Sequence, residues 1–420
     1  MVNRVLMIPF HFPPQSGSSG IQRSLKFSQY LPEYGWEPIV LTAHERAYPS
    51  TSSDQLCEIA QHVKVHRAFA IDAARHLSIF RRYLGVTALP DRWIYWLLGA
   101  VPSGLRLIRE NKPAVIWTTY PIATSHLIGY VLHRLTGIPW VADFRDPMTD
   151  ENYPPNPTKR RLYRWIEKIT LSHCVKAVFT TPGAARNLSE RYPSLPTSHF
   201  CLIENGFDEG NFSNAETNDR HAKQSENNNK QFVLLHSGII YPSERDPIPL
   251  FKALSALRRQ GVIASHNFQL VLRAAHHKQY LLTLIEEHDI NDIVSLPPPI
   301  PYKEALAEML AADGLLILQA SNCNAQIPAK MYEYLRARRP ILALTDPAGD
   351  TAVMMRKAGL DTIAPLDSKE RIMTELSRFI ALVKIKAAPI AALDYVDSNS
   401  RKSRTQQLAT LFDQIIAENK

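Results

Sequence analysis

Short apolar runs and helical repeats alternate along the first half of the chain. Stretches with helical periodicity cover Ile21–Tyr34, Asp91–Asn111 and Ser125–Thr136. Five runs between and around them are apolar and bounded by turn residues, which is typical of buried strands: Val5–Pro9, Pro38–Thr42, Ala114–Thr118, Trp140–Phe144 and Lys176–Thr181. This alternation predicts a parallel sheet with helices on both faces.

A second series of the same kind begins at Phe232, with the runs FVLLHSG, FQLVLRA, DIVSL, GLLILQA and PILALT. Residues 213–230 precede it and contain no large apolar residue, so they predict a mobile linker or a surface loop. We therefore expect Rossmann-like α/β domains at 1–206 and 232–390, a polar interdomain linker at 207–231 and a terminal helical segment at 391–420. The apolar positions of that last helix fall on one face, which needs a surface to pack against: Leu408, Leu411, Phe412, Ile415 and Ile416.

Composition agrees with two ordinary globular domains. The chain has 420 residues, of which 45% are hydrophobic and 21% charged. The net charge of +8 is unevenly placed, because residues 1–200 carry 23 basic and 14 acidic side chains while residues 201–420 carry 25 and 26. The first half therefore either faces an anionic partner or has a solvated basic surface.

Several classes of protein are disfavoured. The four cysteines are far apart and lack histidines at metal-ligand spacing, which supports neither a zinc site nor a disulfide framework and fits a reducing cytosol. The first residues do not resemble a signal peptide, and the most apolar segment, Trp93–Leu105, is too short to span a membrane and contains Pro102. The first glycine-rich loop lacks the spacings of dinucleotide-binding and Walker-type loops.

Ligands of open parallel sheets bind at the carboxyl ends of strands, so the loops there are the candidate sites. The first loop, Ser16–Gly20, leads into a helix whose free amides suit a phosphate or an acceptor oxygen, although the glycines could merely make room. In the segment WVADFRDP, Arg145 and Asp146 follow a buried strand, where charge is costly without a purpose. A purely structural ion pair is the alternative.

Two loops of the second half complete the set. The first of its strands ends in Ser237–Gly238, and Arg245 follows in a loop where it could reach a phosphate or pair with an acidic neighbour. Further on, a polar loop leads through Gln326, Ile327, Pro328 and Ala329 into a helix that opens with Lys330 and Glu333. Lys330 can bring positive charge to a diphosphate and Glu333 can accept hydrogen bonds from a ribose, unless the two form only a helix surface pair.

Two further patterns concern a membrane surface. Arg160, Arg161, Arg164 and Lys168 share a helical face that would attract anionic lipid, and we expect Leu162, Trp165, Ile166 and Ile169 on the opposite face. A solvated basic face is the alternative. The aromatic cluster Trp93, Tyr95 and Trp96 could face a membrane or fill the core.

These segments, taken in order, resemble the family-four glycosyltransferases of the GT-B fold. The resemblance rests on PP…GSSGIQRSLKFSQYLPEYGWEPIVLT, IPWVADFRDP, IENGFD, LLHSGIIY…RDP and IPAKMYEYLRARRPILAL, which span nearly the whole chain. It implies an acceptor domain and a donor domain facing each other across a cleft, with the last helix packed back on the first domain. It also implies transfer of a sugar from a nucleotide donor with retention of configuration and without a metal or other cofactor.

The resemblance assigns roles by position. Gly20 matches the glycine that contacts donor phosphate or sugar, Arg245 the first basic residue of the diphosphate pair, and Glu333 the last glutamate of a paired motif that binds the donor ribose. The chain departs from the family at Ala325, where the first glutamate is expected and where Asn324 or Gln326 could replace its contact. It departs again at Arg145, which stands where a histidine is common.

The function implied is glycosyl transfer to a saccharide or lipid-linked acceptor in bacterial surface polysaccharide biosynthesis. We expect Lys330, Arg245, Gly238 and residues 326–329 to bind the donor, and Arg145 and Asp146 to orient the acceptor. The loop at 296–306 is expected beside the base. The expected location is the cytoplasm, peripherally on the inner face of the membrane, with no nucleic-acid partner. The alternatives are nucleotide-sugar hydrolysis or epimerisation, and a catalytically silent protein that binds sugar nucleotide or acts as a scaffold.

Overall fold

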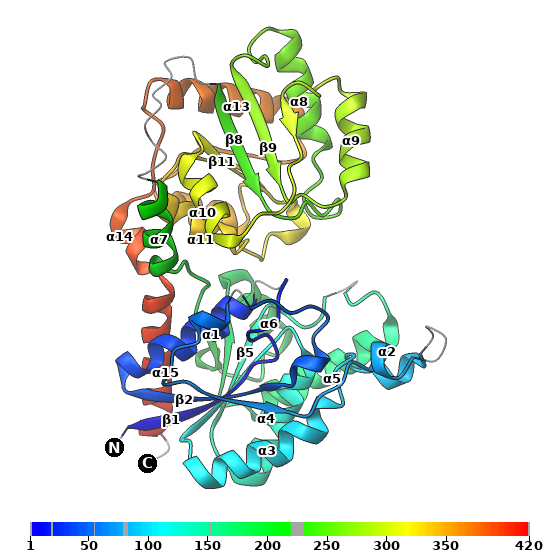
Figure 1. The fold of residues 1–420 in the computed structure, drawn as a ribbon, viewed down its shortest axis with the longest axis vertical. Helices are drawn as coiled ribbons and strands as arrows, with labels where there is room; N and C mark the ends of the chain where they lie inside the picture. The colour runs from blue at the N-terminus through cyan, green and yellow to red at the C-terminus, as the bar shows by residue number, and fades with distance from the viewer. Residues whose placement is uncertain are drawn as a thin grey trace. The chain divides into compact units, whose positions relative to one another are not determined.

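The computed structural model describes residues 2–17, 20–53, 55–78, 83–150, 153–219 and 231–418. The chain divides into two compact units. The first comprises Met1–Asn205 together with Arg401–Lys420, and the second comprises Gly206–Ser400. Each unit has its own parallel sheet, as the alternating pattern predicts (Figure 1). Each unit also has its own buried apolar side chains.

The first unit is built on a seven-stranded sheet in the order β3-β2-β1-β4-β5-β6-β7, and every pair of neighbouring strands is parallel. The strands are β1 (Asn3–Ile8), β2 (Trp36–Ala43), β3 (Lys64–Ala68), β4 (Val115–Thr119), β5 (Trp140–Arg145), β6 (Lys176–Phe179) and β7 (Phe200–Leu202). Alternate residues of β1 enter different cores: Val5 and Met7 pack on one face of the sheet, and Leu6 and Ile8 on the other. Both faces are therefore buried.

The helices of this unit are α1 (Gly20–Tyr30), α2 (Ala73–His76), α3 (Trp96–Asn111), α4 (Ala123–Thr136), α5 (Pro157–His173), α6 (Pro182–Arg191) and α15 (Arg401–Glu418). The local sequence explains where several of these helices begin or end. Asn156 caps α5 by accepting a hydrogen bond from the Lys159 amide, with Pro157 in the first turn. Gly137 ends α4 in a left-handed conformation.

The last helix, α15, packs against α1 in the first unit. Leu408, Phe412 and Ile415 are fully buried there. The Phe412 ring meets that of Trp36 edge-on at 5.0 Å between centroids, and Trp36 Nε1 donates to the Asp413 carboxylate at 3.0 Å. The expected return of the terminal helix to the first domain is confirmed.

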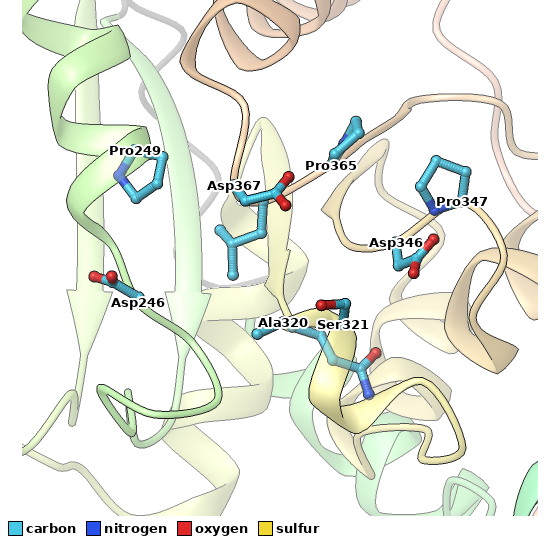
Figure 2. A pocket seen from close by; sticks show the side chains of 10 residues that line it. Asp246, Pro249, Ala320, Ser321, Asp346, Pro347, Pro365 and Asp367 are labelled. Atoms are coloured by element: carbon cyan, nitrogen blue, oxygen red, sulfur yellow. The ribbon is translucent and has the colours of Figure 1, made fainter.

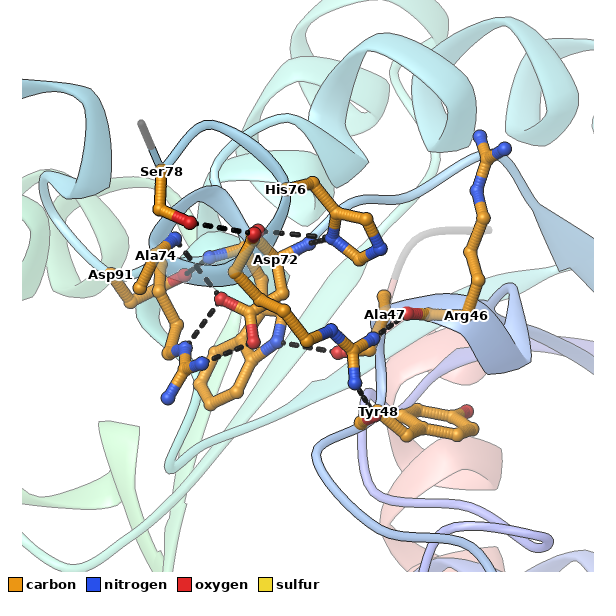
Figure 3. A network of polar contacts seen from close by, with 11 residues as sticks. Arg46, Ala47, Tyr48, Asp72, Ala74, His76, Ser78 and Asp91 are labelled. Carbon is orange, nitrogen blue, oxygen red and sulfur yellow. Dashed lines mark hydrogen bonds and ion pairs between the residues drawn. The ribbon is translucent and has the colours of Figure 1, made fainter. Parts of the chain in front are cut away.

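A polar network holds the described residues around Asp72 and Asp91, between β3 and α3 (Figure 3). Asp72 is fully buried, accepts two hydrogen bonds from the Arg92 guanidinium and caps α2 through the Ala74 amide. Asp91 accepts from the Thr124 amide and hydroxyl at 2.8 and 2.9 Å. Nearby, Trp96 is fully buried and Trp93 donates to the Ala47 carbonyl, so both belong to the core.

The second unit is built on a six-stranded parallel sheet in the order β10-β9-β8-β11-β12-β13. Its strands are β8 (Phe232–Ser237), β9 (Phe268–Arg273), β10 (Val294–Ser295), β11 (Gly314–Leu318), β12 (Ile341–Leu344) and β13 (Ile363–Ala364). Its helices are α7 (Glu209–Asp219), α8 (Ile248–Arg259), α9 (Lys278–Glu287), α10 (Tyr302–Ala311), α11 (Lys330–Ala337), α12 (Asp350–Lys357), α13 (Lys369–Lys384) and α14 (Leu393–Ser398). The α/β fold class is confirmed.

The segment expected as a linker differs from that expectation in its first part. Helix α7 packs against α10 and belongs to the second unit, with Phe212 fully buried. Arg336 of α11 donates to the carboxylates of Glu209 and Glu216, which anchors the polar side of the helix. Residues 220–230, the rest of the expected linker apart from residue 231, lie outside the described residues. The terminal segment also divides, because α14 belongs to the second unit and α15 to the first.

One residue of the expected apolar face of α5 departs from that prediction. Trp165 is exposed over 52% of its surface, and the basic residues Arg161, Arg164 and Lys168 are exposed too, whereas Ile166 is fully buried. Arg160 instead donates to the carbonyl groups of Pro154 and Pro155. Within the described part of the chain, no helix is both long and apolar enough to cross a membrane.

Candidate functional site

The second unit has a switch point between β8 and β11, which pair in parallel although β9 and β10 intervene in the sequence. The chain leaves the carboxyl ends of these strands toward opposite edges of the sheet, and such a point is where α/β sheets bind ligands. Gly238 and Arg245 follow β8, and Lys330 and Glu333 lie in α11, which follows β11. The topology therefore brings the predicted donor residues to one end of the sheet.

Lys330 meets a histidine that the sequence analysis did not assign. Its Nζ lies 3.0 Å from Nε2 of His236, a fully buried residue of β8. His236 Nδ1 lies 2.9 Å from the Leu316 carbonyl oxygen, which can only accept, so Nδ1 carries the proton and Nε2 accepts from the ammonium. Burial, reinforced by the Lys330 charge, lowers the pKa of His236 well below its ordinary value. The imidazole is therefore neutral.

Gly238 makes room for this ammonium. Its φ of +123° is a conformation that favours glycine, and a Cβ at this position would lie 2.9 Å from Lys330 Nζ. The Gly238 amide donates to the Arg273 carbonyl at 2.8 Å, which ties the turn to β9. Any larger residue at position 238 would displace the lysine.

Arg245 supplies a second cation near the first. Its guanidinium donates to the Ile239 carbonyl and lies over the Tyr241 ring at 5.3 Å from the centroid. Burial lowers the pKa of Lys330 well below its ordinary value, and the Arg245 charge lowers it further, while Glu333 opposes the shift. In the part of the chain that the structure describes, no ion pair joins Arg245 to Glu244 or Asp246. Two cations held this close favour an anion beside them.

The backbone at the start of α11 makes several of its hydrogen bonds within the protein. Ile327 is buried, and the carbonyls of Pro328 and Ala329 accept from the amides of Met331 and Tyr332 at 2.9 and 3.3 Å. The Gln326 side chain is exposed, while its carbonyl accepts hydrogen bonds from Gln319 and Thr351 at 2.9 and 3.2 Å. Residues 326–329 thus form a fixed approach to the helix, and Lys330 supplies its charge.

Glu333 has a partner that the sequence analysis missed. The Tyr302 hydroxyl, at the start of α10, donates to Glu333 Oε1 at 2.8 Å. Tyr302 lies in the segment 296–306 that the sequence places beside the base. This contact orients the Glu333 carboxylate.

The loop that lacks the family's first glutamate is bound to the segment between β12 and the first turn of α12. Asn324, next to Ala325, donates from its side-chain Nδ2 to the Asp346 carboxylate at 2.6 Å. Its main-chain carbonyl accepts a hydrogen bond from the Asp350 amide. Asn324 Oδ1 is buried and has no hydrogen-bond partner. Of the two suggested replacements for the missing glutamate, the exposed Gln326 side chain is the less constrained.

A cavity of about 290 Å³ lies in the second unit beyond the ends of β11, β12 and β13 (Figure 2). Asp246, Asp346 and Asp367 line it, together with prolines and the buried Gln319. Neither Lys330 nor Arg245 is among its lining residues. Because carboxylates repel a diphosphate, this cavity does not extend the cationic site.

In the first unit, the predicted loop residue Gly20 is buried as the first residue of α1. One turn on, Arg23 forms a buried two-point ion pair with Asp143 of β5, at 2.7 and 3.1 Å, and donates to the Ile203 carbonyl at 2.9 Å. Asp143 therefore has a structural role, unlike Arg145 and Asp146, the candidate site residues of the same WVADFRDP segment.

The backbone turns sharply at Arg145. Its φ is +62°, the Asp146 amide donates to the Phe144 carbonyl at 2.7 Å, and the register of β5 against β6 shifts there. A three-residue turn of this kind with positive φ is rare and strained for a residue with a side chain, and such strain clusters at functional sites. The Arg145 Nε is buried without a hydrogen-bond partner, and its NH1 lies 3.5 Å from the Tyr120 carbonyl.

Asp146 and His11 share this environment. Burial raises the pKa of Asp146, whereas the Arg145 charge opposes that rise. Burial, with the charge of Arg145, lowers the pKa of His11 to about 3, so this histidine is neutral. His11 follows β1 and was not among the predicted site residues. A histidine, an arginine and an aspartate thus gather at the carboxyl ends of β1 and β5.

The described residues include no group of three or more histidine, cysteine, aspartate or glutamate side chains that could hold a metal ion. The residues of both candidate sites are instead suited to binding anions and hydroxyl groups.

Comparisons with known proteins agree with this fold. Residues 20–206 match the model of the glycosyl transferase 4-like domain. Sucrose-phosphate synthase from Thermosynechococcus elongatus is 14% identical, with a TM-score of 0.66 and coverage of 99% of this chain and 100% of that one. A glycosyltransferase from Rickettsia africae is 13% identical, with a TM-score of 0.66 and coverage of 100% and 99%. Anabaena HepE, solved with UDP, is 13% identical, with a TM-score of 0.59 and coverage of 99% of both chains.

No curated protein sequence matches the chain significantly. The structural matches have low identity and therefore show a shared fold, whereas the family match rests on sequence. Together with the two parallel sheets and the returning C-terminal helix, they show that the chain has the GT-B fold and that its residues 20–206 match the glycosyl transferase 4-like domain.

Proposed function

We propose that the protein transfers a sugar from a nucleoside-diphosphate donor to a saccharide or lipid-linked acceptor in the assembly of a bacterial surface polysaccharide. The observation that carries the proposal is the placement of Lys330 Nζ at the end of β8, held by His236 and close enough to Arg245 for the two charges to interact. A pair of cations at the switch point of a parallel sheet suits a diphosphate.

The donor chemistry follows from where charge develops. As the glycosidic bond breaks, negative charge grows on the leaving diphosphate, and Lys330 and Arg245 stabilise it more than they stabilise the bound donor. Glu333, oriented by Tyr302, accepts a hydrogen bond from the ribose. Gly238 makes room for the Lys330 ammonium beside the diphosphate, and Gln326 replaces the contact of the missing glutamate. Transfer proceeds with retention and without a metal.

The first unit supplies the acceptor groups in this proposal. Arg145 has a buried guanidinium nitrogen without a partner, and Asp146 has a raised pKa next to it. An acceptor hydroxyl that donates to Asp146 and accepts from Arg145 would satisfy both groups. Gly20, the first residue of α1, is assigned to the donor phosphate or sugar; residues 18 and 19 of the preceding loop lie outside the described residues.

The test is a coupled assay with the wild-type protein and a panel of nucleotide sugars, beginning with UDP sugars because HepE was solved with UDP. Release of nucleoside diphosphate only when acceptor is present supports transfer, and unchanged release in EDTA supports metal independence. Release without acceptor indicates hydrolysis. Donor binding without any turnover indicates a catalytically silent protein.

We also propose that the enzyme acts on the inner face of the cytoplasmic membrane and docks through α5. Arg161, Arg164 and Lys168 are exposed beside Trp165, and an exposed tryptophan among basic residues suits an anionic lipid interface. Vesicles of phosphatidylglycerol and phosphatidylcholine should bind the wild type at low salt and release it as salt rises. Trp165→Ala and Arg161→Ser/Arg164→Ser should each weaken binding, and equal binding to neutral vesicles would contradict the proposal.

A further inference from the structure

His236 contacts the candidate donor-binding residue Lys330, but it is itself too deeply buried to contact a donor. Its side chain is fully buried in β8, between the Leu316 carbonyl on one side and Lys330 Nζ on the other. The first contact fixes which nitrogen carries the proton, because a carbonyl accepts only from N–H. The second nitrogen is thereby left as an acceptor that faces the lysine.

Lys330 needs such a partner in order to stay in place. A lysine side chain has a flexible four-carbon stem with much rotamer entropy, so an unrestrained ammonium occupies many positions. At 3.0 Å from His236 Nε2, and packed over Gly238 where no Cβ intervenes, the ammonium is confined to the end of β8. Without the histidine, the lysine could turn toward Glu333 one helical turn on.

The neutrality of the histidine is essential to this arrangement. A protonated imidazole would turn an N–H toward the ammonium and would place a third positive charge beside Lys330 and Arg245. Full burial, reinforced by the charges of Lys330 and Arg245, keeps His236 uncharged, as the direction of its pKa shift indicates. The imidazole therefore acts as a fixed hydrogen-bond acceptor.

We infer that His236 is a positioning residue, which acts through Lys330 by holding its ammonium at the end of β8, where it and Arg245 can contact the same diphosphate. This inference rests on the proposed function. It adds a requirement that the family resemblance does not contain, because it links a buried strand residue to the donor affinity of a helix residue 94 positions away.

The test is a double-mutant cycle with inorganic diphosphate and UDP as probes, measured by titration calorimetry at pH 7.5. His236→Asn keeps an amide that can donate to the Leu316 carbonyl but does not reach Lys330, whereas His236→Gln extends an acceptor toward it. We expect His236→Asn to weaken diphosphate binding about tenfold, the size of one charged hydrogen bond, and His236→Gln to restore part of the loss. In a Lys330→Ala background, His236→Asn should change the affinity less than twofold.

The outcomes separate this inference from the proposed function. If Lys330→Ala binds both probes as tightly as the wild type, the proposed donor site is wrong. If Lys330→Ala weakens binding and His236→Asn does not, the site stands and the positioning role is overturned. An equal loss from His236→Asn with and without Lys330 would also overturn it, because the histidine would then act independently. Thermal unfolding of each variant, with Lys252→Ala as an exposed lysine control, excludes a folding defect.

Discussion

At the scale of single residues, the candidate donor site depends on the positive charge of Lys330, whose side chain is partly buried. Lys330 faces His236 from β8, Arg245 from the loop before α8 and Glu333 from its own helix. Burial and Arg245 disfavour its charged form, and Glu333 favours it. A bound diphosphate adds negative charge and so raises the pKa of the lysine again.

This linkage predicts a pH dependence of donor affinity. Below the lowered pKa of free Lys330, the ammonium is already charged and the affinity should be constant. Above it, binding must take up a proton, so the affinity should fall as pH rises until the pKa of the bound state is reached. Lys330→Arg should remove this fall, because arginine stays charged. Titration of UDP between pH 6 and 10 in two buffers of different ionisation heat measures both the affinity and the proton uptake.

Glu333→Gln should act on binding more than on chemistry. A ribose contact is made equally in the bound donor and in the transition state, so its loss should raise the donor KM about tenfold with little change in kcat. Tyr302→Phe is the matched variant, because it removes the hydrogen bond to Glu333 without changing the charge. A large loss of kcat in Glu333→Gln would instead place this carboxylate in the bond-breaking step.

The sequence identified site residues that lie in loops or at a helix start, and it missed those whose role depends on contacts distant in the sequence. Lys330, Glu333 and Arg245 stand in loops and at a helix start, where local pattern alone marks them as candidates. His236 stands inside an apolar strand, and its partner is 94 residues away, so only the fold reveals its role. His11 was missed for the same reason, because its link to Arg145 depends on the packing of β1 near β5.

At the scale of elements, the central strands were predicted because they are buried on both faces and therefore read as continuous apolar runs. β3 and β7 were not predicted. They are the edges of the sheet, with partly exposed residues such as Lys64 and His66 in β3, and β7 has only three residues. Helix α7 was taken as part of a linker because its polar surface hides the contribution of Phe212 to the core.

The buried pair Arg23–Asp143 joins α1 to β5 and gives a stability prediction at this scale. Arg23→Met should lower the free energy of unfolding by about 3–5 kcal/mol, because it leaves the Asp143 carboxylate buried without its cation. Arg4→Met, which removes the half-exposed pair with Glu37, should cost at most about 1 kcal/mol. Urea unfolding followed by tryptophan fluorescence compares the two, and equal losses would contradict the structural role of Arg23.

At the scale of the whole molecule, the chain returns to its first unit through α15. Phe412→Ala should destabilise that unit by about 3–5 kcal/mol, because the ring is fully buried against Trp36. Amide hydrogen exchange read by mass spectrometry should show faster exchange in β1, β2 and α1, with β8–β13 unchanged. Faster exchange in both units alike would show that they unfold as one, contrary to the separate cores described above.

The central claim is that Lys330 stabilises the departing diphosphate, and single-turnover transfer by Lys330→Ala tests it most directly. With the cognate donor saturating and an acceptor present, the rate constant should fall about 10²–10³-fold, as when other charge-stabilising groups are removed. Lys252→Ala should keep the wild-type rate, and both variants should melt at nearly the wild-type temperature. A folded Lys330→Ala protein that transfers sugar at the wild-type rate would contradict the account.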